Sequence, residues 1–324
     1  MYTDIPIWLS SLFIVAGLAA LAWSSDRFVA GAAALSRRLG ISEFVVGMVV
    51  VGFGTSAPEL LVSTFSGLSG HTNLSIGNAY GSCVFNIIGI LGVAALIRPL
   101  VVKPSISFVA VPLLTAITAL SLFLLRDGSL ARGDALTLLA IFAVVMPLYC
   151  KFDKPAEGGD DAASAPTTLA AAILWTLVGL GVMVGASHIL VWGAVDIARA
   201  LGVGELLIGL TIVAIGTSIP ELASAIAAAR RSEAELVLGN IVGSNLFNTL
   251  AVVGIAGSIS PSSAFSRFVV VRDLPILLAA TLSIAAFGLN YRSPRQNGLV
   301  SRWQGLLWVL ALAAYMTLTL CQEL

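Results

Sequence analysis

One segment of this chain occurs twice. Residues 39–92 align without a gap onto residues 201–254 at a constant offset of 162, which is half of the 324-residue length. Nineteen of the 54 aligned pairs are identical. Chance does not keep polar, proline and glycine positions in register over so much apolar sequence. We therefore interpret the chain as two related halves.

Two polar motifs lie within the repeat. The first is Gly-Thr-Ser-x-Pro-Glu, at residues 54–59 and again at 216–221. The second is Gly-Asn-x-x-Gly-Ser-x-x-Phe-Asn, at residues 77–86 and again at 239–248. Each half thus places a carboxylate, hydroxyls and an amide inside apolar sequence. This combination indicates a buried cation site to which both halves contribute.

The composition is that of a membrane protein. The mean hydropathy is +1.00 and 10% of residues are charged, whereas soluble domains carry about 25% charged residues. The apolar runs are continuous over about twenty residues, which favours helices over the alternating strands of a β-barrel. The expected surroundings are a lipid bilayer. No basic cluster suits nucleic acid, and the three cysteines form no metal-ligand spacing.

We predict an all-α membrane protein with ten transmembrane helices as two inverted five-helix repeats. The predicted spans are 5–24, 41–68, 73–97, 105–125, 133–151, 167–195, 203–229, 235–258, 270–290 and 303–322. Residues 1–151 form the first repeat, residues 152–166 a polar cytoplasmic linker, and residues 167–324 the second repeat. Because five is odd, the second half lies upside down relative to the first.

The placement of basic residues predicts the orientation. With the N-terminus outside, twelve of the 17 Lys and Arg residues fall on the inside and five on the outside. This bias favours both termini outside, since loops on the cytoplasmic side carry the excess of positive charge. We expect a multi-pass protein of a bacterial or archaeal cytoplasmic (inner) membrane that functions as a monomer.

The second and seventh spans are predicted to be broken helices. Pro58 and Pro220 have no N–H to donate and clash with the preceding turn. A break frees backbone carbonyls, which a membrane tolerates only where they line a cavity or meet protein partners. Hard cations prefer oxygen ligands. The two breaks offer them hydroxyls and carboxylates, from Thr55, Ser56, Glu59, Thr217, Ser218 and Glu221.

The next span of each half supplies further oxygens. Ser82 and Asn86 are four residues apart and share a helix face, and Ser244 and Asn248 repeat this spacing. Nearby glycines predict a close approach of another backbone, at Gly77, Gly81, Gly239 and Gly243.

Structural roles compete with ligand roles at these positions. A serine or threonine often only bonds to its own helix, and an asparagine is ordinary glue between helices. The carboxylates of Glu59 and Glu221 are different, because an intramembrane carboxylate is costly and rare. The functional interpretation therefore rests mainly on this pair and on its duplication.

Both motifs resemble the alpha repeats of the calcium/cation antiporter superfamily, most of all its bacterial sodium/calcium exchanger-type members. The resemblance covers the whole chain. It implies that the hydroxyl, carboxylate and amide positions named above line adjacent Na⁺ and Ca²⁺ sites. It also implies ligands from backbone carbonyls near Gly52 and Ala214, and spans 1 and 6 that slide against the rest.

The chain departs from this family at several positions. Several members carry Asp where this chain has Asn86 or Asn248, so the two motifs supply two carboxylates. Two negative charges neutralise one Ca²⁺ or two Na⁺, which leaves the exchange ratio open. Proton-coupled relatives usually carry a Glu near the positions of Ser82 or Ser244, so its absence favours Na⁺ coupling.

We predict a secondary active transporter, not an enzyme, that exchanges Na⁺ for Ca²⁺ by alternating access. Ca²⁺ and Na⁺ bind as substrates, and no cofactor is expected. A Ca²⁺/H⁺ or other cation/H⁺ antiporter is the alternative. A channel is less favoured, because two broken helices in an inverted repeat are typical of carriers. An intramembrane hydrolase using Ser56 or Ser218 is a distant alternative, because neither histidine repeats with these serines.

Overall fold

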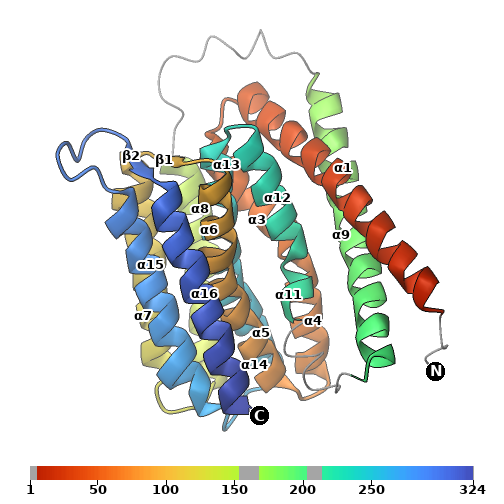
Figure 1. Cartoon of the computed structure of the whole chain (residues 1–324). Helices are drawn as coiled ribbons and strands as arrows, with labels where there is room; N and C mark the ends of the chain where they lie inside the picture. The colour runs from red at the N-terminus through yellow and green to blue at the C-terminus, as the bar shows by residue number, and fades with distance from the viewer. Residues whose placement is uncertain (1–5, 153–167, 203–213, 324) are drawn as a thin grey trace.

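A computed structural model describes residues 6–152, 168–202 and 214–323 (Figure 1). The first half contains α1 (Ile7–Leu39), α2 (Glu43–Val46), η1 (Gly47–Val51), α3 (Gly52–Thr55), α4 (Ala57–Leu68), α5 (Thr72–Val84), η2 (Phe85–Leu91), α6 (Gly92–Ile97), β1 (Leu100–Val102), η3 (Ile106–Ala110), α7 (Val111–Leu124) and α8 (Arg132–Phe152). The second half contains α9 (Leu169–Ala200), α11 (Ala214–Thr217), α12 (Ile219–Arg230), α13 (Ala234–Leu246), η6 (Phe247–Val252), α14 (Val253–Ile259), η7 (Val269–Asp273), α15 (Leu274–Gly288), β2 (Gly298–Val300) and α16 (Arg302–Glu323).

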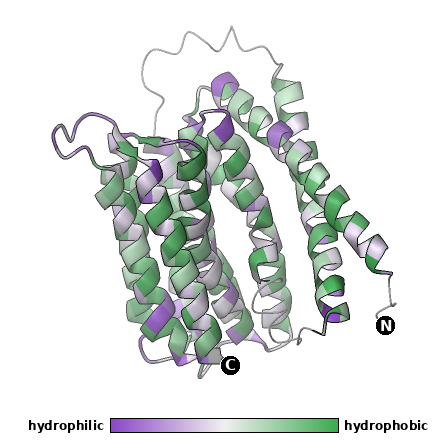
Figure 2. Ribbon diagram, viewed as in Figure 1, coloured by the Kyte–Doolittle hydropathy of each residue, from purple (hydrophilic) through white to green (hydrophobic). Residues whose placement is uncertain are grey.

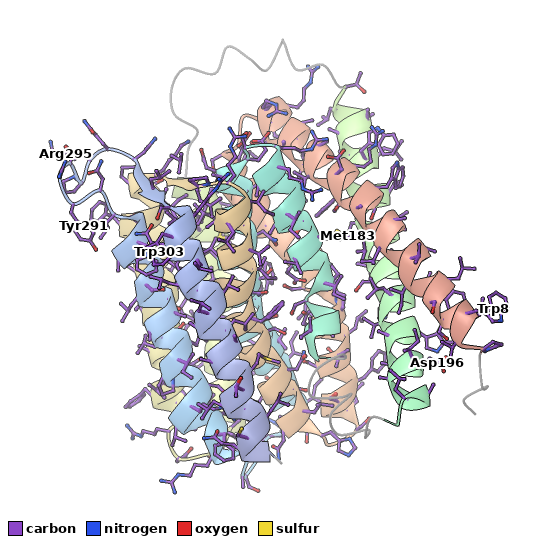
Figure 3. The ribbon with its side chains drawn as sticks, in the orientation of Figure 1. Trp8, Met183, Asp196, Tyr291, Arg295 and Trp303 are labelled. Atoms are coloured by element: carbon purple, nitrogen blue, oxygen red, sulfur yellow. The ribbon has the colours of Figure 1, made fainter. Side chains whose placement is uncertain are left out.

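The chain is a membrane protein built from helices, as predicted. Among the described residues, eight helices are long and apolar enough to cross a membrane, and one bent pair raises this number to nine. Hydrophobic residues run along the helices and hydrophilic ones gather toward their ends (Figure 2). Exposed aromatic side chains lie at opposite sides of the molecule, with Trp8 at the right and Tyr291 and Trp303 at the left (Figure 3). Such rings are typical of membrane–water interfaces.

The predicted span boundaries agree with the described helices in most places. The helix formed by α5, η2 and α6 covers 72–97, where 73–97 was predicted, and that formed by α13, η6 and α14 covers 234–259, where 235–258 was predicted. The linker at 152–166 and the start of the span at 203–229 lie almost wholly outside the described residues. Of that span the structure describes only 214–229.

The first helix is longer than predicted. The apolar pattern ends it near residue 24, but α1 continues to Leu39 and stops at Gly40, whose φ of 63° is left-handed. The polar residues at 24–26 have hydrogen-bond or ion-pair partners within the fold. Ser24 and Ser25 donate to carbonyls of their own helix, and Asp26 pairs with Arg231. A polar stretch therefore did not mark the helix end.

The helix break at Pro58 is confirmed. The segment Glu43–Thr55 meets Ala57–Leu68 at an angle of 46°, with Ser56 between them. In the second half Ser218 separates α11 from α12 in the same way, and Pro220 lies in the first turn of α12. The breaks thus carry Ser56 and Ser218 at equivalent positions.

The long helices α1 and α9 pack on each other through glycines and lie at one side of the bundle (Figure 1). A Cβ at Gly17 would lie 2.9 Å from Leu190 Cβ, and one at Gly179 would lie 2.7 Å from Phe28 N. The offset of 162 relates residue 17 to 179 and residue 28 to 190. Each helix therefore uses the equivalent glycine to contact the equivalent residue of the other helix.

Wider π-helical turns also recur at matching positions. Adding 162 to η2 (85–91) gives 247–253, where η6 spans 247–252. Adding 162 to η3 (106–110) gives 268–272, where η7 spans 269–273. π-Turns are uncommon and often mark functional positions. Away from them, β1 pairs antiparallel with β2 and joins the halves at one end of the bundle.

Candidate cation site

The predicted site residues come together in the interior, where the two helix breaks face α5/η2 and α13/η6. Most of their described side chains are buried, and Thr217 is half-buried. Those that are 4% exposed or less are Thr55, Ser56, Glu59, Ser82, Asn86, Ser218, Glu221, Ser244 and Asn248.

The hydroxyls of each break bond to the carboxylate of the other half. Ser56 Oγ donates to Glu221 Oε1 at 3.1 Å, and Ser218 Oγ lies 3.5 Å from Glu59 Oε1. Thr217 also contacts Glu59, and Thr55 also contacts Glu221. The two glutamates are therefore held by reciprocal contacts that cross between the halves.

Four buried oxygens at the centre have no hydrogen-bond partner among the described residues. They are Glu59 Oε2, Glu221 Oε2, Asn86 Oδ1 and Asn248 Oδ1. A buried acceptor without a partner is costly, so each needs an explanation. All four are hard oxygen donors of the type that Na⁺ and Ca²⁺ prefer, and each half supplies two. Carboxylate and amide oxygens of this kind can replace the hydration shell of a cation.

The backbone carbonyl near Gly52 lies close to the second half of the chain. The Gly52 carbonyl accepts from Ser56 N at 3.1 Å and from Ser244 Oγ at 3.4 Å, so it is not an unpaired oxygen. Ala214 is the first described residue of α11.

Asn240 is a site neighbour that the sequence analysis did not single out. Its amide donates to Ser224 Oγ at 3.0 Å, and its Oδ1 accepts from Thr55 Oγ1 at 3.3 Å. Ser244 Oγ lies 3.5 Å from the same oxygen. Asn240 is part of the duplicated Gly-Asn motif, which was the available signal. It positions hydroxyls next to the open oxygens.

A second asparagine, Asn245, joins the two central helices. Asn86 Nδ2 donates to Asn245 Oδ1 at 3.1 Å, and Asn245 Nδ2 donates to the Cys83 carbonyl at 3.2 Å. The amide of Asn86 therefore serves as interhelical glue while its Oδ1 remains open. The structural and ligand roles weighed for this residue are compatible.

Within the described part of the chain, no three His, Cys, Asp or Glu side chains gather in a manner suited to a tightly held metal. The centre instead offers two carboxylates and neutral oxygens. This set carries limited negative charge, which suits a cation that must bind and leave again.

Comparisons with known proteins match this architecture. The family described as "Sodium/calcium exchanger protein" matches residues 9–149 and 171–321. The candidate antiporter CaxA of Alkalimonas amylolytica is 36% identical over 95% of this chain and 97% of its own. Inner membrane protein YrbG of Escherichia coli strain K12 is 35% identical over 90% of this chain and 91% of its own. A structure of the sodium-calcium exchanger NCX_Mj superposes with a TM-score of 0.84 at 28% identity, covering 98% of this chain and 99% of that one.

The fold and the family match define an ion-exchanging membrane transporter, not an enzyme. The chain belongs to the sodium/calcium exchanger family. The hydrolase alternative is thereby set aside.

Proposed function

We propose that this chain exchanges Na⁺ for Ca²⁺ through one shared central site by alternating access. The observation that carries the proposal is the set of four unpaired buried oxygens on Glu59, Glu221, Asn86 and Asn248. Their two carboxylates neutralise one Ca²⁺ or two Na⁺, so the two ions compete for one place. The surrounding hydroxyls, amides and the carbonyls near Gly52 and Ala214 complete the proposed ligand set.

The proposed architecture is ten spans in two inverted repeats, with residues 203–229 as the seventh span. The reciprocal glycine contacts of α1 with α9 and the recurring π-turns support a two-fold relation between the halves. The two ends of the described chain lie toward one end of the bundle, and the ends of α8 and α9 that flank 153–167 lie toward the other (Figure 1). We place the termini outside and the linker in the cytoplasm of a prokaryote, in its inner membrane, with the monomer as the working unit.

The test is ⁴⁵Ca²⁺ uptake into proteoliposomes loaded with Na⁺, with an outward Na⁺ gradient applied or absent at clamped pH. Wild type is compared with Glu59→Gln and Glu221→Gln, which keep the side-chain shape and remove the charge. Asp127→Asn is the matched control, since Asp127 lies in an exposed turn and bonds only to Ser129 in the described structure. We expect gradient-driven uptake in wild type and control, and at least a hundredfold loss in both glutamine variants.

Other outcomes point elsewhere. Uptake that ignores Na⁺ but follows a pH gradient identifies the proton-coupled alternative, in which the buried carboxylates carry protons. Flux that rises linearly with driving force identifies a channel. Unchanged uptake in both glutamine variants rejects the proposed site.

A further inference from the structure

A cavity of about 340 Å³ runs along α5 between that helix, η7 and α16. It is lined by Asn73 near the start of α5 and by Ser82 nine residues later, and Thr217 of the opposite half also lines it. Nine residues of α-helix span about 13 Å. The cavity therefore extends from one end of the bundle to two residues of the candidate cation site.

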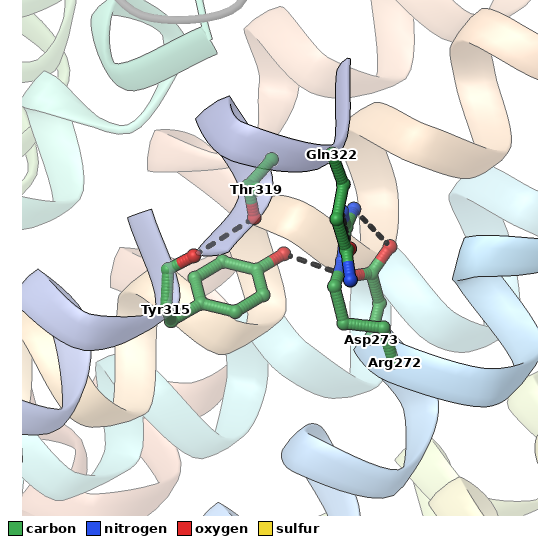
Figure 4. Close-up of polar contacts among 5 residues, drawn as sticks. All are labelled: Arg272, Asp273, Tyr315, Thr319 and Gln322. Carbon is green, nitrogen blue, oxygen red and sulfur yellow. Dashed lines mark hydrogen bonds and ion pairs between the residues drawn. The ribbon is translucent and has the colours of Figure 1, made fainter. Parts of the chain in front are cut away.

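A buried ion pair forms part of the wall of this cavity (Figure 4). Arg272 Nε donates to Asp273 Oδ1 at 2.7 Å, and the two side chains are 9% and 7% exposed. Tyr315 Oη donates to the same carboxylate oxygen at 3.0 Å, and Arg272 Nη1 donates to Gln322 Oε1 at 3.0 Å. The carboxylate and the guanidinium neutralise each other at the cavity wall.

This pair has no counterpart in the first half. Subtracting 162 from 272 and 273 gives Ala110 and Val111, which are apolar. A buried ion pair costs desolvation free energy and is weak evidence for a stabilising role. The pair lies in the first five residues of a span but is buried, and buried ionisable residues in a membrane protein are a sign of function. In an inverted repeat the central site can be reached from either side of the membrane. The pair lies on one of these sides only.

We propose that the Arg272–Asp273 pair sets the electrostatic potential of this cavity and thereby the apparent affinity of the site for cations that arrive through it. This inference rests on the proposed function. Asp273 attracts cations, and Arg272 offsets this attraction so that they are not trapped before they reach Ser82 and Thr217. The pair acts through charge and does not ligate the transported ion.

Removing one charge at a time has opposite effects. Without the guanidinium, Asp273 leaves an uncompensated negative charge in the wall, which raises apparent cation affinity. Without the carboxylate, Arg272 leaves a positive charge that lowers it. Across about 10 Å at an effective dielectric constant of about 40, one unit charge changes the binding of a divalent cation by on the order of tenfold. The binding of a monovalent cation changes by roughly the square root of that factor, because the electrostatic interaction energy is proportional to the valence.

The experiment measures KM for external Ca²⁺ and for external Na⁺ in proteoliposomes. Four variants are compared with wild type: Arg272→Gln, Asp273→Asn, the double variant, and Tyr315→Phe, which removes a hydrogen bond without changing charge. We expect the Ca²⁺ KM to fall about tenfold in Arg272→Gln and to rise about tenfold in Asp273→Asn, with Na⁺ KM shifts of about threefold. The double variant and Tyr315→Phe stay within about twofold of wild type. Raising ionic strength shrinks the single-variant shifts.

Shifts of the Ca²⁺ KM with the same sign in both single variants, or a double variant whose KM departs from wild type as far as those of the single variants, overturn the proposal in favour of a packing role. If one single variant does not fold, the other gives the sign of its KM shift, and the double variant shows whether removing the second charge restores the wild-type KM. A wild-type protein that shows no cation exchange rejects the proposed function itself. Exchange in wild type without opposite KM shifts rejects only this inference.

Discussion

The two copies of the central helix carry the same motif in different surroundings. The copy at 234–259 is buried along its whole most apolar stretch, whereas the copy at 72–97 is buried over 72% of it. A Cβ at Gly239 would meet the Phe44 carbonyl, and one at Gly243 would meet Met48. Among the described residues, nothing lies within 4 Å of a Cβ at the equivalent Gly77 or Gly81, and both line the cavity.

The difference between these copies lies in their neighbours. In α13 the glycines admit the backbone of α2 and η1, as the sequence predicted. In α5 the equivalent glycines leave space beside the candidate site instead. A repeated motif therefore does not imply a repeated environment. The asymmetry between halves can be tested by making the same substitution on both sides.

The largest difference is expected for alanine at the glycine pairs. Gly243→Ala forces a methyl group onto the backbone of Met48, which cannot rotate away, and overpacking of this kind costs about 3 kcal/mol. Gly81→Ala meets no described neighbour, and alanine improves helix propensity by about 1 kcal/mol. Thermal unfolding in detergent should thus show a large fall in Tm for Gly243→Ala and none for Gly81→Ala. The same contrast is expected between Gly239→Ala and Gly77→Ala. Equal losses on both sides would show that α5 is as tightly packed as α13.

A smaller difference is expected at the asparagines of the same motif. Asn240 bonds to Ser224 and Thr55, so Asn240→Ala removes two buried hydrogen bonds between side chains and costs about 2 kcal/mol. Its counterpart Asn78 has a buried amide nitrogen with no partner among the described residues. Asn78→Ala should therefore cost less than about 1 kcal/mol. Unfolding midpoints of the two variants check this ranking, and a more damaging Asn78→Ala would reverse the assignment of the polar network to α13.

The sequence predicts most of the helices well, and it picks out polar residues that the structure brings together in the interior. Continuous apolar runs define most spans, and duplication identifies Glu59 and Glu221 without any structural knowledge. It does not predict that Ser56 bonds to Glu221, because this contact joins positions 165 residues apart. It also misses the length of α1 and the Arg272–Asp273 pair. Asp26 of α1 pairs with Arg231, which is 205 residues away, and the Arg272–Asp273 pair is held by Tyr315 and Gln322 of α16. Local hydropathy does not reveal such distant partners.

The smallest difference concerns an ion pair that exists at one end of the bundle only. Arg231 Nε and Nη2 donate to the two oxygens of Asp26 at 2.8 Å each, joining α1 to the turn between α12 and α13. The offset of 162 relates Asp26 to His188 and Arg231 to Ser69, which cannot form an ion pair. The Arg231 and Asp26 side chains are 38% and 51% exposed. Exposed pairs of this kind contribute about 0.5 kcal/mol.

A double-mutant cycle with Asp26→Asn and Arg231→Gln measures this coupling from unfolding midpoints. We expect about 0.5 kcal/mol, and less at 1 M salt, because exposed charges are screened. Asp26 raises the pKa of the Arg231 guanidinium through their hydrogen bonds. A raised pKa means that this stabilisation is lost only as pH rises through the new, strongly basic value, so the coupling should be equal at pH 7 and pH 9. A coupling above about 2 kcal/mol would exceed the range for an exposed pair. Such a value would mean that the ion pair between α1 and the α12–α13 turn makes its end of the bundle more stable than the other end.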